Sequence, residues 1–190
     1  MRPTTFLLAP LAGALLAAPA AAQTGALRAA PSTRATAEVV LTLADTAAAR
    51  VAGPSKIRID YGQPHLRGRR LHTDSLVPYD RLWRTGANDP TTLTTDVDLT
   101  IGGTAVPKGS YVVQSMPARA GWQLVLQKPP AAQGGQPTDV ARIPLRAVTL
   151  PQAVESLTFW LIPSTQPGAA RGELRFAWGT TALAADWQVR

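Results

Sequence analysis

Hydrophobic and polar residues alternate with a period of two along most of the chain. Ile57, Ile59 and Tyr61 fall on one face of this pattern. Leu174 and Phe176 do the same near the carboxyl terminus. A period of two places successive side chains on opposite sides of an extended strand, whereas a helix repeats about every 3.6 residues. The pattern therefore predicts strands that each bury one face.

Turn-forming residues separate these expected strands at short intervals. Gly102-Gly103 and Pro107-Lys108-Gly109 interrupt the alternation, and the stretch from Leu93 to Ile101 before them has the pattern of one half-buried strand. We count about eight short strands with turns between them, which is typical of an antiparallel sandwich or barrel. The predicted fold is all-β: an antiparallel, jelly-roll-like β-sandwich with little helix.

The first 22 residues have the three parts of a secretory signal. Arg2 is a short basic start, Phe6 to Ala18 is apolar, and Ala20 to Ala22 supplies small residues for cleavage. The apolar part is shorter than the roughly 20 residues that a membrane-spanning helix needs. We expect cleavage after Ala22, no transmembrane segment in the mature protein, and a secreted or periplasmic location.

Residues 23–53 are rich in Ala, Thr, Ser and Arg, and we interpret them as a flexible tether. Within this segment, Glu38 to Leu43 alternates and could form one strand, while Ala47 to Ala49 suits a frayed helical turn. The β-sandwich domain is expected over residues 54–190.

Composition narrows the chemistry. The 190 residues include 19 basic and 12 acidic side chains, a net charge of +7, and no cysteine. The lack of cysteine excludes disulfides, thiol catalysis and thiolate metal sites. Most basic residues are arginine, which pairs well with carboxylates and phosphates. An exported chain without a helix-turn-helix or RNA-binding motif is a poor candidate for binding nucleic acid. A carbohydrate or an anionic envelope ligand is a better candidate partner.

Residues 61–92 form the longest stretch without a strand pattern. Connections longer than about 12 to 15 residues are usually functional or disordered. Leu76, Val77, Tyr79 and Trp83 are large and apolar, which argues against disorder. We therefore expect a long ordered loop that packs on one end or face of the sandwich.

Short motifs in and after this loop resemble those of a known family. They are Tyr61-Gly62-x-Pro64, Gly68-Arg69, Leu76-Val77-Pro78-Tyr79, Trp83-Arg84-Thr85-Gly86-Ala87-Asn88 and Pro107-x-Gly109-x-Tyr111. Their order and separation resemble the bacterial family catalogued as domain of unknown function 2911, over roughly Ala52 to Trp187. The resemblance implies an exported or envelope-associated domain of unassigned activity. The chain departs from the family pattern at Gln63, at His72 to Ser75 and at Asp89.

The same loop holds a candidate ligand site. Its residues are Tyr61, Arg69, Trp83, Arg84, Asn88 and Asp89. A flat indole, a forked cation, an amide and a carboxylate can together stack on and hydrogen-bond a sugar or another polar ligand. The alternative is structural: Trp83 fills the core and Arg84 pairs with Asp80 or Asp89. Outside the loop, Trp160 is out of phase with its neighbours and is a candidate exposed aromatic residue.

Other polar residues have weaker patterns. His65 and His72 are the only histidines and lack the spacing of a metal-binding motif, so we expect no metal and no cofactor. Asp96 and Asp98 would lie about 7 Å apart on one strand face, a spacing that a two-carboxylate hydrolase or a calcium loop could use. A solvent-facing polar edge is the simpler explanation of this pair.

We expect a non-catalytic binding module for an envelope or extracellular ligand such as carbohydrate. Two alternatives stay open. One is a hydrolase that uses Asp and His groups of residues 61–98. The other is a structural domain that packs against an envelope partner through a sheet edge or an apolar patch.

Overall fold

The computed structural model describes residues 26–129 and 135–190, so the expected signal peptide lies outside the described residues. Nine strands form one antiparallel sheet, accompanied in the described ranges by one short helix. The predicted all-β, antiparallel class is confirmed. The described part of the chain contains no helix that is long and apolar enough to cross a bilayer.

The elements follow one another as β1 (Thr33–Leu41), α1 (Thr46–Ala52), β2 (Ser55–Gln63), β3 (Thr91–Thr95), β4 (Leu99–Ile101), β5 (Thr104–Val106), β6 (Gly109–Met116), β7 (Trp122–Lys128), β8 (Thr138–Pro163) and β9 (Arg171–Val189). Across the sheet their order is β1-β2-β3-β6-β7-β8-β9-β4-β5. Every neighbouring pair is antiparallel.

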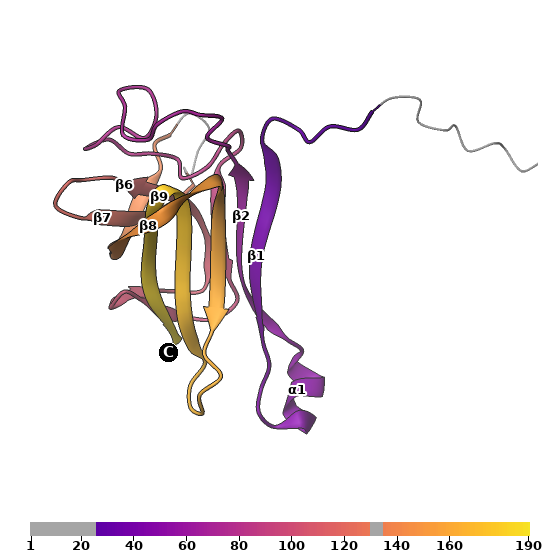
Figure 1. Cartoon of the computed structure of the whole chain (residues 1–190). Coiled ribbons are helices and arrows are strands. Elements are labelled where there is room, and N and C mark those ends of the chain that lie inside the picture. The colour runs from indigo at the N-terminus through magenta and orange to yellow at the C-terminus, as the bar shows by residue number, and fades with distance from the viewer. Residues whose placement is uncertain (1–25, 130–134) are drawn as a thin grey trace, which may run out of the picture.

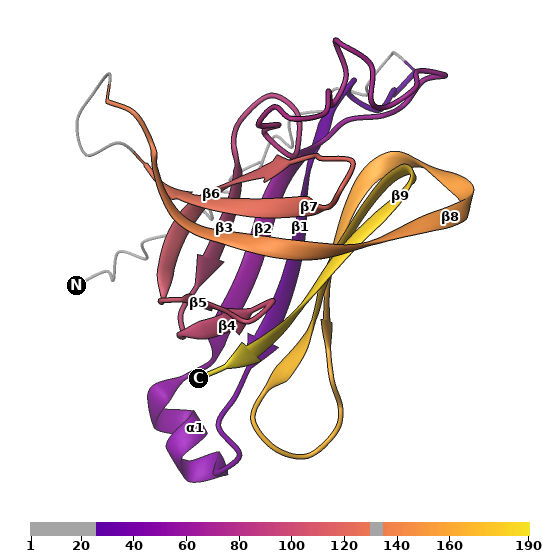
Figure 2. The ribbon, with the colours of Figure 1, turned by 90° about the vertical axis from the view of Figure 1, so that its left-hand side faces the viewer.

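Strands β8 and β9 are long and bent, and they give the sheet its shape. The first part of β8, to Leu145, pairs with β7, and the part from Arg146 onward pairs with β9. β8 therefore joins two halves of the sheet, β1-β2-β3-β6-β7 and β9-β4-β5. β9 bends and returns, so that its two arms, residues 171–178 and 182–189, lie side by side (Figures 1 and 2). Gly179, which has a positive φ of 62°, lies between the two arms in the sequence. At their open ends the Val189 amide donates a 2.8 Å hydrogen bond to the Ala170 carbonyl.

The sheet coils until the end of β2 reaches β8. Just beyond β2, the Leu157 amide donates to the Pro64 carbonyl at 3.0 Å, and the Leu66 amide donates to the Glu155 carbonyl at 2.8 Å. This contact joins segments that are far apart in the chain and closes one end of the molecule around the core.

One hydrophobic core lies between the two halves. Its largest fully buried side chains are Tyr111, Phe176, Ile57, Ile59, Leu93, Leu99, Ile101, Leu124, Leu126, Ile143, Leu157 and Leu174. Ile57, Ile59, Leu174 and Phe176, which alternation predicted to be buried, are among them, and Tyr61 is also buried, at 3% exposed. Each such side chain contributes about 1.5–3 kcal/mol when it leaves water, so this core is the main source of stability in a chain without disulfides.

The segment from Leu93 to Ile101 is two strands, and its prediction as one strand is wrong. β3 ends at Thr95 and pairs with β2 and β6, whereas β4 begins at Leu99 and pairs with β9 and β5. Asp96 and Asp98 hold the crossing between them. Asp96 accepts a 2.8 Å hydrogen bond from the Lys56 amide, and Asp98 accepts one of 2.7 Å from the Lys108 amide.

The amino-terminal segment contains both elements that its sequence allowed. β1 starts at Thr33, earlier than the predicted strand from Glu38, and all nine of its residues pair with β2. The side chain of Asp45 accepts hydrogen bonds from the first turn of α1, which projects from the sheet (Figure 1). The division of the chain into a tether and a domain at residue 54 stays a prediction.

Candidate functional site

The long loop between β2 and β3 is packed over one end of the sheet (Figure 1). Two hydrogen bonds of 2.8 Å, in which the amides of Trp83 and Ser115 donate to each other's carbonyls, tie it to β6. Val77 is 2% exposed and Leu66 is 8% exposed, so the loop contributes its own side chains to the core. This extensive packing explains why the segment is ordered without regular structure.

Glycines bring two of the short sequence motifs into backbone contact. The Ala87 amide donates a 3.1 Å hydrogen bond to the Gly62 carbonyl. A Cβ atom at Gly62 would overlap the Ala87 carbonyl, and one at Gly86 would lie 2.5 Å from Oγ1 of Thr91. The end of β2 and residues 86–88 can therefore approach this closely only because both positions lack a side chain.

Trp83 and Thr85 belong to the same framework. The half-buried indole of Trp83 stacks on Trp178, with ring centroids 5.8 Å apart and planes 14° apart. The fully buried Thr85 hydroxyl donates to the Trp83 carbonyl at 3.1 Å and lies 2.7 Å from Oγ of Ser115, which donates to it. One face of the Trp83 indole is thus packed against another tryptophan.

Two further predicted residues also serve the fold. Tyr61 is buried, and its hydroxyl accepts a 3.2 Å hydrogen bond from the Phe159 amide. Burial raises the pKa of this phenol. Arg69 folds back on its own turn and donates to the carbonyls of Leu66, at 3.0 Å, and His65, at 2.7 Å.

Arg84, Asn88 and Asp89 are exposed on the outer side of the loop. The Asn88 amide donates to the Ser32 carbonyl at 3.4 Å. Within residues 26–129 and 135–190, the side chains of Arg84 and Asp89 make no hydrogen bond or ion pair, so Arg84 does not pair with Asp80 or Asp89 there. The structure spreads the six predicted residues over the core, a turn and an open surface, and their role in ligand binding stays a prediction.

The two histidines lie in different environments. Nδ1 of His65 is 2.6 Å from Oγ of Ser156, while the ring of His72 stacks on Tyr79 with centroids 4.4 Å apart. No group of three or more histidine, aspartate or glutamate side chains among the described residues is arranged to hold a metal ion.

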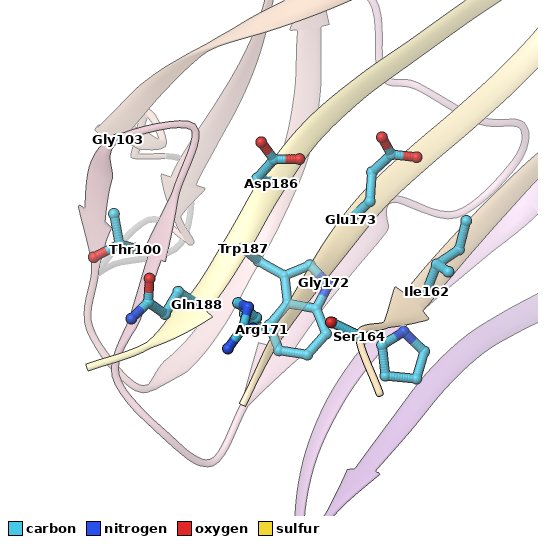
Figure 3. Close-up of a pocket in the computed structure, with 11 residues that line it drawn as sticks. Thr100, Gly103, Ile162, Ser164, Arg171, Gly172, Glu173, Asp186, Trp187 and Gln188 are labelled. Atoms are coloured by element: carbon cyan, nitrogen blue, oxygen red, sulfur yellow. The ribbon is translucent and has the colours of Figure 1, made fainter. Parts of the chain in front are cut away.

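A groove that the sequence did not predict lies between the two arms of β9. Its volume is about 540 Å³. Arg171 and Glu173 border it on the first arm, and Asp186 and Gln188 border it on the returning arm (Figure 3). The indole of Trp187 lies between the arms and forms the floor (Figure 3). The groove is thus open at the surface and lined at its bottom by an aromatic ring.

Gly172 allows the indole to lie so close to the first arm. A Cβ atom at this position would overlap the Ile162 carbonyl and lie 2.7 Å from Cζ2 of Trp187. Trp187 is 2% exposed, and its indole N–H finds no acceptor in the described part of the chain. A buried donor without an acceptor costs about 1–3 kcal/mol, so the close packing of Trp187 on Gly172 carries a cost in stability.

Arginines hold the two carboxylates of the groove in place. Arg146 of β8 donates to Glu173 at 3.1 Å and to both oxygens of Asp186 at 3.0 and 3.1 Å, so it links the two arms. The hydrogen bonds and charge of Asp186 raise the pKa of Arg146. Arg175 pairs with the other oxygen of Glu173 at 2.5 Å. The acids are therefore oriented acceptors, with their charge largely balanced.

Sequence reasoning missed this groove for a physical reason. Glu173, Asp186 and Gln188 occupy ordinary outward positions of alternating strands. Only the bend of β9 brings them together (Figure 2). The available signal was Gly179, which the sequence places as a turn between two alternating stretches, from Leu174 to Trp178 and from Leu183 to Val189.

A family model with the description "Protein of unknown function (DUF2911)" matches residues 43–186. The match covers the long loop with its motifs and most of the groove. Neither curated proteins nor solved structures give a match.

Proposed function

The chain belongs to the DUF2911 family of proteins of unknown function, and we propose that it is an exported, non-catalytic module that binds a carbohydrate. The proposed site is the groove between the arms of β9. Its composition is the observation on which the proposal depends: fixed carboxylates, an amide and a guanidinium surround an aromatic floor.

These groups suit a polyhydroxylated ligand. Asp186 offers oriented oxygens to sugar hydroxyls, Glu173 offers Oε2 while its Oε1 is buried, and the Gln188 amide can donate and accept at once. Ile162 adds an exposed apolar wall on which the C–H faces of a sugar ring can pack. The groove volume lies within the roughly 300–1,000 Å³ of small-molecule sites.

The hydrogen bonds that Arg146 donates to Glu173 and Asp186 favour a role in binding over a role in catalysis. Arg146 donates to both carboxylates, which favours a role as hydrogen-bond acceptors. A general acid would instead have to hold a proton and release it to the leaving group. The proposal therefore assigns recognition to Glu173 and Asp186.

The first test is a glycan array of envelope and extracellular oligosaccharides, followed by calorimetric titration of each glycan that binds. Gln188→Ala removes an exposed groove amide and should weaken binding about ten-fold, or ~1.4 kcal/mol. Gln123→Ala, the same change at an exposed position on β7, is the matched control and should leave affinity unchanged.

Arg84→Ala and Trp83→Ala test the site predicted from the sequence in the same titrations. If these variants lose affinity and Gln188→Ala retains it, the binding site lies in the loop and not in the groove. An array on which the wild-type protein binds no glycan would refute the proposal.

A further inference from the structure

Trp160 is a large aromatic residue that the core does not use. Its neighbours Phe159 and Leu161 point inward and are buried, whereas Trp160 is 38% exposed on the outer face of β8. Exposing an indole forfeits the stabilisation that burial would give it, and an exposed aromatic side chain commonly marks a binding surface. This position therefore needs an explanation beyond the fold.

The register of β8 and β9 places Trp160 beside the groove. Trp160 pairs with Arg175, and the next outward pair along the strands is Ile162 with Glu173. Residues opposite each other in antiparallel strands share one face of the sheet, as do residues two apart in one strand. Ile162 and Glu173 line the groove. Trp160 and Arg175 are thus the next row of the same face, about 7 Å away along the strands.

This row has the chemistry of a second sugar subsite. The indole offers an apolar face on which a sugar ring can stack. Arg175 stands across from it, held by its 2.5 Å ion pair with Glu173, and its remaining N–H groups can donate to hydroxyls. The distance from Ile162 at the groove wall to Trp160, about 7 Å along the strand, is comparable to the size of a sugar ring.

From this continuity, and on the basis of the proposed function, we infer that the ligand is an extended glycan chain. One sugar residue occupies the groove, and the chain continues along the outer face of β8 and β9 onto Trp160. The groove alone accepts short sugars, and Trp160 supplies the preference for longer ones.

The test is calorimetric titration of the full chain with two ladders, cello-oligosaccharides and β-1,4-linked N-acetylglucosamine oligomers, from the disaccharide to the hexasaccharide. Wild-type affinity should rise about ten-fold with chain length in at least one ladder. Trp160→Ala should remove this rise and leave disaccharide affinity unchanged, while Trp160→Tyr should keep most of it. Val148→Ala, which truncates another exposed apolar residue of β8, is the control and should keep the full rise.

The outcomes separate the two proposals. Affinity that does not depend on length, or a rise that survives in Trp160→Ala, overturns the extended-chain inference but leaves groove binding intact. Gln188→Ala should weaken every length alike. If neither ladder binds the wild-type protein, this inference is rejected, and the glycan array decides the proposed function separately. Trp160→Ala should lose some stability, because most of its indole surface is covered, but should still unfold cooperatively well above the titration temperature, which shows that lost affinity is not lost folding.

Discussion

Gly62 shows at the residue scale how two of the short motifs depend on each other. Its carbonyl accepts from the Ala87 amide, and its missing side chain leaves room for the Ala87 carbonyl. The Tyr-Gly and Trp-to-Asn motifs are therefore two sides of one backbone contact. The residues by which the family resemblance is recognised build the framework, whereas the groove is formed by other residues.

Gly62→Ala should lower the free energy of unfolding by about 3 kcal/mol, because the new methyl group meets backbone atoms that cannot rotate away. Urea denaturation measures the change. Gly103→Ala is the control: its surroundings are open but its φ is +80°, so only the conformational cost of about 1 kcal/mol applies. Equal losses in the two variants would contradict the close contact at Gly62.

At the scale of elements, alternation predicted the buried faces of the strands but not where one strand ends. Leu93, Thr95 and Leu99 keep the same phase on both sides of the crossing from β3 to β4, so the pattern continues through a break in the strand. The break depends on Asp96 and Asp98, whose carboxylates accept hydrogen bonds from backbone amides of other segments. The groove was missed for a similar reason, because it arises from the bend of β9 rather than from a local motif.

Asp98→Ala should lower the free energy of unfolding by about 1 kcal/mol, because the Lys108 amide loses its acceptor. Asp98→Asn retains an acceptor oxygen and should restore most of this loss. Asp89→Ala, at an exposed side chain, should stay within about 0.5 kcal/mol of the wild type. Chemical denaturation of the three variants checks the order. Equal stability of Asp98→Ala and the wild type would remove the structural role assigned to this carboxylate.

At the scale of the whole molecule, β1 covers one side of the core. Val39 is 8% exposed, and Ala35, Ala37 and Leu41 pack against the core from the same strand. A chain that starts at Ser55 should therefore unfold at a lower urea concentration, with a loss of about 3 kcal/mol or more from the exposed apolar surface. A chain that starts at Ala26 retains β1 and should match the full mature protein. Equal midpoints for both truncated chains would show that the compact domain begins at residue 54, as the sequence predicted.

The closure of β2 against β8 also determines how the molecule forms. Gln63 donates its amide hydrogen to the Leu157 carbonyl, 94 residues further along the chain. The entropy cost of closing such a long loop must be overcome before this contact can stabilise the folded state. Folding is therefore expected to take about milliseconds to seconds. A nascent polypeptide on the ribosome cannot complete this junction until residue 157 has been synthesised and has emerged.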